Sequence, residues 1–341
     1  MNSFIDDYFQ VYILPVSSHV VGKYRFQSIS PAPFLGILWR KVPMSPPKHF
    51  LIAGATGRQG GAVVTALLSS TEFGIDPKNV YAITRDPAGA SAQRLASTWP
   101  GINIVAGNLN NSDALFKQLK SSILPETAVF LAQAHGPTEV DDAKGFIDAA
   151  KSYGVAYFVY SSVDRGGRQL SDSDPSYCKT FSDKFIIEKH LKDVAEKGMA
   201  YTILRPTWFA ENAWWGFPGK LCMAGWKVWM KGKRMQVVTA RDVGRWAAEA
   251  LIRPDRTGIR NEALSVASDY LSFPEVDEIF KKKTGKGVPV TYGWFTSLMI
   301  WMVKDLNTMF NFINERDYGA DLPWLKERLE PTTFAQWVDT I

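Results

Sequence analysis

The stretch 51-LIAGATGRQGGAVV-64 decides the fold of this chain. A short apolar run is followed by three glycines at three-residue intervals, Gly54, Gly57 and Gly60, and then by apolar residues at helical spacing. A strand, a G-x-x-G-x-x-G loop and a helix together favour a dinucleotide site over a purely structural turn. Gly54 permits the tight turn, Gly57 leaves room for a pyrophosphate, and Gly60 lets the helix pack close to the strand. The helix N-terminus would then face the phosphates.

Six apolar runs of β type alternate with helix-like segments after this start. They cover residues 50–55, 80–85, 102–108, 128–133, 157–162 and 201–206. Such alternation predicts an α/β fold, a Rossmann doubly wound parallel sheet covered by helices on both faces. Beyond Pro206 the alternation ends: an aromatic segment precedes a helix over Asp242 to Leu251 and a strand-like ALSVA (263–267).

Three regions are therefore expected. Residues 47–206 would form a dinucleotide-binding Rossmann domain, and residues 207–341 a smaller C-terminal substrate-side lobe with segments that return to the sheet. Residues 1–46 are expected to be an extension outside the fold. A mis-set start codon, with Met44 as the true start, and a disordered arm explain that extension about equally well, and a targeting role comes third.

Composition narrows the class of protein. The chain has 341 residues, of which 46% are hydrophobic, enough to bury a core and to exclude global disorder. Its net charge is only +5, and the lysine cluster at 281–286 favours a solvated helix end over a nucleic-acid patch. Cys178 and Cys222 lack the spacing of a disulfide framework or a metal site, and the longest apolar run, Trp294 to Val303, is too short to span a bilayer. We expect a cytoplasmic protein with no metal, no nucleic-acid partner and no membrane partner.

The end of the second strand indicates which dinucleotide binds. An NAD-selective protein places a carboxylate there for the ribose 2′-hydroxyl, whereas this chain reads Ile83-Thr84-Arg85-Asp86-Pro87. Arg85 can donate two hydrogen bonds to a 2′-phosphate, and Arg58 either reaches it from the other side or is a solvated charge. Asp86 weakens the argument slightly, but the pattern favours NADP.

The motifs GATGRQGG, ITRDP, GNLNN, FVYSS, TFSDK and LRPTWFAEN occur in this order. Together they resemble the NmrA-like family of atypical short-chain dehydrogenase/reductases, from about Lys48 to the C-terminus. Members of that family have a Rossmann domain that prefers NADP. They divide into reductases, many in secondary-metabolite pathways, and redox-sensing regulators that bind the dinucleotide without turning it over.

The resemblance also implies positions for the cofactor contacts. The loop would hold the pyrophosphate, Arg85 the 2′-phosphate, Asn108 and Leu109 the adenine, Gln133 the nicotinamide ribose, and Lys184 with the 208–212 turn the nicotinamide. The cofactor-binding residues implied are Gly54, Ala55, Thr56, Gly57, Arg58, Gln59, Gly60, Arg85, Asn108, Leu109, Gln133, Lys184, Trp208, Phe209, Glu211 and Asn212.

The catalytic group is the open question. Ordinary short-chain dehydrogenases use Tyr-x-x-x-Lys, but four residues before Lys184 stands Thr180, and Tyr177 lies three residues too early. The position of the companion serine falls on Ser161-Ser162 or on Val163. Isoflavone-reductase-like relatives lack the tyrosine as well, and their lysine is thought to be the general acid or base itself. Lys184 is therefore the catalytic candidate, and the alternative is that it only bonds the ribose hydroxyls.

An aromatic segment follows the sixth strand. Its rings belong to Trp208, Phe209, Trp214, Trp215, Phe217, Trp226 and Trp229. They suit the wall of a pocket for a flat, apolar or aromatic small molecule, or they fill a seam between lobes or an oligomer interface. Glu211 and Asn212 are expected to anchor the turn, and His135 is a further candidate proton donor.

The sequence thus predicts an NADP-dependent oxidoreductase. Its reaction would reduce a C=O or a conjugated C=C of a small apolar or aromatic secondary metabolite by hydride transfer. The alternative function is a catalytically silent NADP(H) redox sensor that binds a protein partner.

Overall fold

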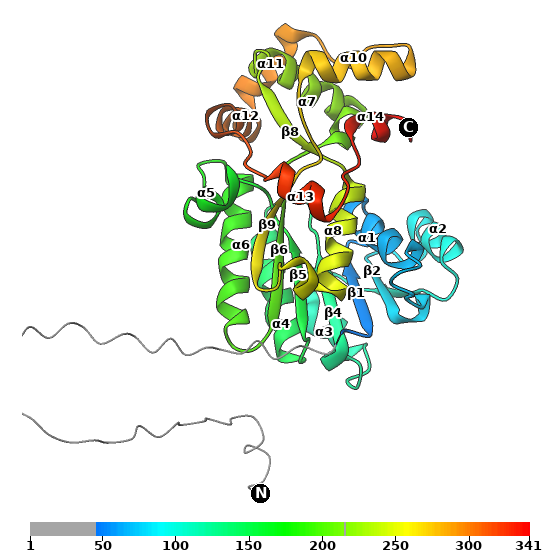
Figure 1. Cartoon of the computed structure of the whole chain (residues 1–341). Coiled ribbons are helices and arrows are strands. Elements are labelled where there is room, and N and C mark those ends of the chain that lie inside the picture. Colours follow the sequence, from blue (N-terminus) through cyan, green and yellow to red (C-terminus); the bar gives the residue numbers. More distant parts are fainter. Residues whose placement is uncertain (1–45, 215) are drawn as a thin grey trace, which may run out of the picture. The chain divides into compact units, whose positions relative to one another are not determined.

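Seven parallel strands form the main sheet of the computed structural model, which describes residues 46–214 and 216–341. The strand order is β3-β2-β1-β4-β5-β6-β9 (Figure 1). The strands are β1 (His49–Ala53), β2 (Val80–Thr84), β3 (Asn103–Ala106), β4 (Thr127–Leu131), β5 (Tyr157–Ser161), β6 (Ala200–Pro206) and β9 (Glu262–Val266). All six predicted strands are present, and the ALSVA segment supplies the seventh.

The central strands are apolar because both of their faces are covered. Phe50, Leu51, Ile52 and Ala53 have no exposed surface, and every residue of β4 and β5 is buried. Leu51 pairs in register with Tyr81 of β2 and with Val129 of β4. The doubly wound α/β fold expected from the alternation is confirmed.

Helices pack on both faces of this sheet. They are α1 (Arg58–Ser69), α2 (Ala90–Thr98), α3 (Ser112–Lys117), α4 (Glu139–Ser152), α5 (Gly167–Ser173), α6 (Lys179–Ala195), α8 (Ala240–Ile252) and α9 (Pro254–Thr257), with short 3-10 turns η1 (Pro77–Asn79), η2 (Leu109–Asn111) and η3 (Leu124–Glu126). Phe116 of α3, Phe146 of α4 and Ile187 of α6 share one apolar core with the strands. Helices α1 and α8 pack against each other, and α8 also contacts β4, β5 and β6.

The C-terminal elements build a second core. Strands β7 (Trp208–Phe209), β8 (Arg234–Val238) and β10 (Asp269–Ser272) form a small sheet in the order β10-β8-β7. Around it lie η4 (Ala210–Trp214), α7 (Gly216–Trp229), α10 (Phe273–Thr284), α11 (Gly293–Met302), α12 (Lys304–Arg316), α13 (Leu322–Arg328) and α14 (Phe334–Val338). Because β7 directly follows β6, these elements gather beyond the carboxyl ends of the main strands, at the top of Figure 1.

Two buried aspartates tie late segments back to the main sheet. Asp164, which follows β5, accepts hydrogen bonds from the backbone N–H groups of Gly167 and Gly319 and from the hydroxyl of Ser265 in β9. Asp242 of α8 accepts from the backbone and the hydroxyl of Thr332. Residues 45–341 form one compact unit, so the domain boundary at residue 206 stays a prediction.

Two further expectations concern the N-terminal extension and membrane-spanning helices. The extension over residues 1–46 lies outside the described residues except for Pro46. In the described ranges, every helix is too short or too polar to cross a bilayer.

Candidate functional site

The predicted site residues follow the carboxyl ends of neighbouring strands. Gly54 comes directly after β1, Arg85 after β2, Asn108 after β3 and Gln133 after β4, while Ser161 ends β5. The chain runs from β1 outward to β2 and β3, then returns to the other side of β1 with β4. In open α/β sheets a ligand binds in the crevice at such a reversal. The fold therefore puts the glycine loop and Gln133 after the carboxyl ends of two adjacent strands, β1 and β4, at this reversal.

The glycine loop has the geometry that a pyrophosphate requires. Gly54 has φ +76°, in the left-handed region, and its carbonyl oxygen accepts the N–H of Gly57 at 2.9 Å. A Cβ on Gly60 would lie 2.5 Å from the carbonyl carbon of Gly54 and 2.8 Å from the nitrogen of Ala55. Gly57 caps α1 without a side-chain hydrogen bond, and the first turn of α1 contains no acidic residue. This positive helix end fits an anionic group.

Side-chain bonds connect the loop to β5. The hydroxyl of Ser161 donates to Oε1 of Gln59 at 2.6 Å. The next hydroxyl, of Ser162, donates to Glu188 of α6. Both candidate catalytic serines thus have structural partners, and Val163 offers no polar side chain.

Arg85 directly follows β2 and is exposed to solvent. Asp86 is exposed as well. The Asp86 carboxylate lies against Gly89, the N-cap of α2, where a Cβ would come within 2.6 Å of it. The positive end of α2 therefore attracts this carboxylate, and Arg85 is the charged side chain available for a phosphate.

The next strand end carries the residues expected at the adenine. Asn108 is exposed, and its Oδ1 accepts from the backbone of Asn110, which makes it the N-cap of η2. Leu109 is partly buried and packs against the core of α3, α4 and α6.

Lys184 lies in a charged cluster beside Gln133. Its Nζ is 2.6 Å from Oε1 of Glu139, the first residue of α4, and 3.4 Å from the carbonyl oxygen of Gln133. The Lys184 side chain is 10% exposed and that of Glu139 has no exposed surface. Nζ also lies 5.4 Å from the ring centroid of Tyr160, close enough for a cation–π contact. The side-chain oxygen of Gln133 is buried without a protein partner, which leaves an acceptor for a ligand hydroxyl.

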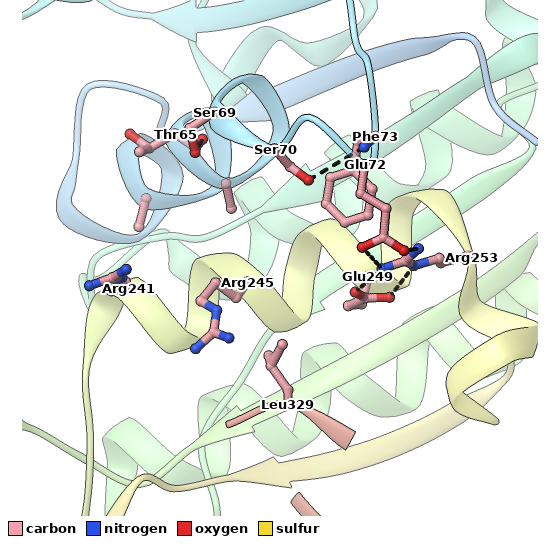
Figure 2. Close-up of a pocket in the computed structure, with 12 residues that line it drawn as sticks. Thr65, Ser69, Ser70, Glu72, Phe73, Arg241, Arg245, Glu249, Arg253 and Leu329 are labelled. Atoms are coloured by element: carbon pink, nitrogen blue, oxygen red, sulfur yellow. Dashed lines mark hydrogen bonds and ion pairs between the residues drawn. The ribbon is translucent and has the colours of Figure 1, made fainter. Parts of the chain in front are cut away.

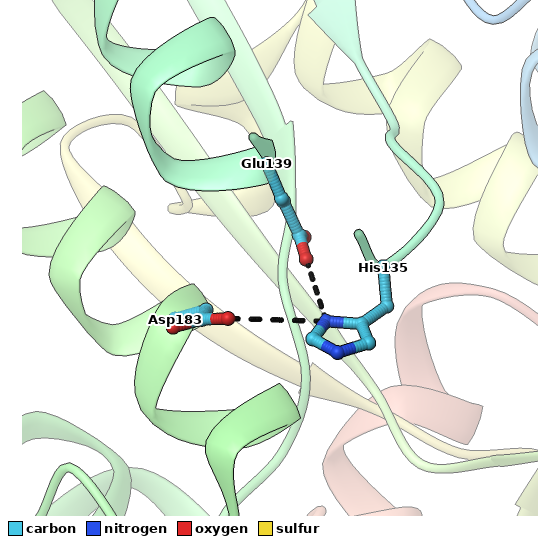
Figure 3. Close-up of side chains that lie close together, drawn as sticks. All are labelled: His135, Glu139 and Asp183. Atoms are coloured by element: carbon cyan, nitrogen blue, oxygen red, sulfur yellow. Dashed lines mark hydrogen bonds and ion pairs between the residues drawn. The ribbon is translucent and has the colours of Figure 1, made fainter. Parts of the chain in front are cut away.

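Two acidic side chains lie near Nδ1 of His135, the other candidate proton donor. Its Nδ1 is 3.0 Å from Oε2 of Glu139 and 3.9 Å from Oδ2 of Asp183 (Figure 3). These ligand-type atoms lie within 4.8 Å of one another. A metal ion would have to displace ammonium groups, because Lys184 pairs with Glu139 and Lys179 pairs with Asp183 at 2.6 Å. The arrangement fits a hydrogen-bonded charge network better than a metal site.

Neither nearby tyrosine is a ready acid. The hydroxyl of Tyr177 donates to Glu315 of α12, and partial desolvation together with that carboxylate raises the pKa of Tyr177 to about 12. Burial raises the pKa of Tyr160 far above its ordinary value. Lys184 and His135 therefore stay the candidate proton donors near Gln133.

The turn after β6 is an anchor, as expected for Glu211. Oε1 of Glu211 accepts from the N–H of Ala240 at 2.8 Å. Burial raises the pKa of Glu211, and the nearby charge of Arg58 opposes that shift. Phe209 and Asn212 are partly buried in the same turn.

The aromatic segment does not form one wall. Trp208 and Trp226 fill the core of the C-terminal elements, where Trp208 lies 6.2 Å from Trp226 and 5.8 Å from Phe310 between ring centroids. Trp214 and Phe217 are 55% and 57% exposed, and Trp229 packs at the edge of that core. Trp215 lies outside the described residues. Of the two uses expected of these rings, the burial of Trp208 and Trp226 favours packing over a pocket wall. A pocket role for the more exposed rings stays a prediction.

A separate pocket of about 580 Å³ lies between α1 and α8, away from Lys184 (Figure 2). Its charged groups largely bind one another: Arg253 pairs with Glu249 of its own helix and with Glu72. The pocket borders α1, the helix that begins in the glycine loop.

Sequence reasoning missed Glu139 and Asp183. Glu139 looks like an ordinary acidic residue in the first turn of a helix, followed by Asp141 and Asp142. The available signal was its position four residues after His135 and directly after the fourth strand and its loop.

Comparisons with known proteins point to one family. The model of the NmrA-like family matches residues 46–338. The NmrA-like family domain-containing oxidoreductase ptmS of Penicillium ochrochloron is 29% identical over 293 residues, covering 79% of this chain and 84% of that protein. The NAD(P)H azoreductase of Xenophilus azovorans is 27% identical over 251 residues, covering 71% and 75%. Among solved structures, the NADPH complex of the Escherichia coli quinone oxidoreductase QOR2 has a TM-score of 0.62 at 20% identity, over 85% of this chain and 99% of that one.

Proposed function

The chain belongs to the NmrA-like family, and from this premise we propose that it is an NADPH-dependent oxidoreductase that reduces a small conjugated molecule. The observation that carries the proposal is the position of Lys184. Its ammonium lies 3.4 Å from the carbonyl oxygen of Gln133, which follows β4, the strand beside the one that leads into the glycine loop.

The cofactor proposed is NADP(H). The loop from Gly54 to Gly60 would hold the pyrophosphate with backbone N–H groups, and Arg85 would bind the 2′-phosphate with its guanidinium. The exposed Arg85 and the Asp86 carboxylate turned to Gly89 support the preference for NADP over NAD. Similar solved structures described as complexes with NADPH or NADP(H) support it further.

Lys184 is proposed as the proton donor. The bound dinucleotide would supply a hydride to the substrate. The Lys184 ammonium would then donate a proton from Nζ to the atom that gains negative charge. Glu139 holds this ammonium in place, and Tyr177 is bound to Glu315 near the C-terminal end of α12.

The substrate proposed is a small apolar or aromatic secondary metabolite with a C=O or a conjugated C=C. Quinones and azo compounds, which the names of two relatives contain, are flat conjugated electron acceptors. Phe209 and the exposed Trp214 and Phe217 supply aromatic surface after β6, the strand beside β5.

The test compares Lys184→Met and Lys184→Arg with the wild type on a panel of quinones and conjugated ketones. NADPH fluorescence measures cofactor binding, and stopped-flow absorbance measures hydride transfer in a single turnover. We expect Lys184→Met to lower the single-turnover rate by about 10²-fold or more, as expected for loss of a general acid. An unchanged rate with weakened NADPH binding would reduce Lys184 to a ribose ligand.

The alternative is an NADP(H) sensor without turnover. It is favoured by one observation, the threonine at position 180 where short-chain dehydrogenases have tyrosine. Tight NADPH binding, no oxidation with any member of the panel, and a protein partner captured only with one redox form of the cofactor would establish it.

A further inference from the structure

The two oxygens of Glu139 bind different groups. Oε1 is 2.6 Å from Nζ of Lys184, and Oε2 is 3.0 Å from Nδ1 of His135. One carboxylate therefore bridges an interior ammonium and a histidine that lies nearer the surface (Figure 3 shows the His135 side). Since a carboxylate only accepts, the His135 tautomer that fits this contact carries its proton on Nδ1.

Burial of this carboxylate is costly unless it is paired. Its side chain has no exposed surface, and the ammonium of Lys184 together with the positive end of α4 offset the cost. A buried ion pair is weak support for stability, because apolar residues of the same size often fill such a place as well. The pair and its link to His135 instead suggest a role in the reaction.

Of the three side chains, that of His135 is the most exposed to solvent. The side chain of His135 is 34% exposed, that of Lys184 10%, and that of Glu139 0%. A cofactor and substrate seated at Lys184 would remove its remaining contact with water. After Lys184 gives up a proton, the amine needs another route by which a proton returns.

We propose that His135 and Glu139 form this route, returning a proton from solvent to Lys184 after each reduction. The inference rests on the proposed function, in which Lys184 is the acid. His135 and Glu139 act through Lys184, so they are relay and positioning residues.

Each step conserves protons. When Nζ of Lys184 protonates the substrate, one N–H bond breaks and a neutral amine remains. The Nδ1–H bond of His135 then breaks as its proton joins Oε2 of Glu139, while Nε2 takes up a proton from solvent. The carboxyl group turns about its Cγ–Cδ bond, a soft torsion, and passes the proton to Nζ. His135 returns to its starting tautomer when Nε2 releases its proton to solvent and Nδ1 takes one up. The net transfer is one proton from solvent to substrate, and the electrons are those of the hydride.

The charges that face His135 come from three helices. Glu139 lies on α4, and Lys179, Asp183 and Lys184 lie on α6. Asp305 at the start of α12 has its Oδ2 3.8 Å from Nε2. Asp305 is half exposed and lies at the ring nitrogen that the route assigns to solvent.

The first test uses the protein without cofactor. Lysines are labelled by reductive methylation with ¹³C-formaldehyde, and Lys184→Arg identifies the Lys184 signal. We expect this signal to show an additional inflection where His135 titrates, because both groups share Glu139. His135→Gln should remove the inflection. Glu139→Gln should also remove it, because the shared carboxylate is then gone.

The second test is kinetic. The control variant is His190→Gln. His190 lies on the same helix as Lys184, and its Nε2 is 2.8 Å from the carboxylate of Asp148. We expect His135→Gln to complete the first turnover at the wild-type rate, because Lys184 starts charged, and then to turn over at least ~10-fold more slowly. Imidazole in solution should restore the later turnovers, whereas His190→Gln should behave as the wild type with or without imidazole.

The outcomes separate the two proposals. Two results would overturn the relay and leave the oxidoreductase proposal intact. One is a loss of turnover in His135→Gln that imidazole does not restore. The other is a Lys184 titration curve that is the same in His135→Gln as in the wild type. No NADPH oxidation by the wild type on any substrate would remove the proposed function. In that case the titration still decides whether Glu139 couples the two groups.

Discussion

The carbonyl carbon of Gly54 lies only 2.5 Å from the place where a side chain on Gly60 would begin. Gly60→Ala must therefore push the loop away from α1, which we expect to lower the free energy of unfolding by about 1 to 3 kcal/mol. NADPH binding should weaken more than ~10-fold because the loop amides move. Gly61→Ala is the matched control, since its Cβ would meet the Ala55 oxygen at an ordinary 3.4 Å. Urea denaturation measures the free energy of unfolding, and fluorescence titration measures the affinity for NADPH. If Gly60→Ala binds NADPH as the wild type does, the assignment of the loop to the pyrophosphate is contradicted.

Arg85 should decide between the two dinucleotides. Arg85→Ala removes charge-assisted hydrogen bonds worth about 1.5 to 3 kcal/mol, so NADPH binding should weaken by roughly 10- to 100-fold. NADH lacks the 2′-phosphate and should bind Arg85→Ala and the wild type equally. Arg94→Ala, which removes another exposed arginine from α2, is the control and should leave both affinities unchanged. Equal losses for NADPH and NADH would show that Arg85 does not contact the 2′-phosphate.

A buried network under the site predicts acid sensitivity. Glu188 contacts Arg165 at 3.0 Å and Arg205 at 2.6 Å, and both guanidinium groups are fully buried. Burial alone would raise the pKa of Glu188, but the two arginines outweigh it and lower the pKa below the ordinary 4.5. A lowered folded-state pKa stabilises the protein above pH 4.5, and this contribution is lost as the pH falls through the folded-state value.

Urea denaturation at a series of pH values from neutral to below pH 4.5 measures this loss of stability. Glu188→Gln removes the carboxylate that Arg165 and Arg205 share and leaves Arg205 with Asp172, and we expect a loss of about 3 to 5 kcal/mol at neutral pH. The same variant should lose less further stability than the wild type on acidification. Glu278→Gln, at an exposed position, should stay within about 0.5 kcal/mol of the wild type.

The two thiols should be inert in the folded protein. Burial raises the pKa of Cys178 and raises that of Cys222 to about 11. At about pH 8 neither forms much thiolate, so an aromatic disulfide reagent should react slowly with native protein. Both thiols should react at once in concentrated guanidinium chloride. Rapid reaction of one native thiol would mean that α7 or the start of α6 opens readily.

The strands were predictable because the sequence carries their boundaries. Each apolar run from β1 to β6 is short and separated by helical periodicity, and the observed ends differ from the predicted ones by only a few residues. The glycine loop was predictable for the same local reason. The model of the NmrA-like family confirms the resemblance.

The charged cluster was not predictable, because its parts meet only in three dimensions. Glu139 follows a loop after β4, Lys184 lies 45 positions later in α6, and no periodic pattern joins them. The burial of Trp208 and Trp226 likewise depends on Phe310, which comes from α12. The roles of Lys184, Arg85 and the 208–212 turn stay predictions until a cofactor is bound.

The hydrogen bonds from Gly319 to Asp164 and from Thr332 to Asp242, together with β9 beside β6, have a consequence for protein engineering. No single cut in the chain separates the elements that hold the cofactor from those that would hold the substrate. In a chimera that joins two relatives at residue 206, the two partners of each of these contacts would come from different proteins and need not fit each other. New specificity in this scaffold must therefore come from point changes or from several segments exchanged together, which restricts how relatives can diversify by recombination.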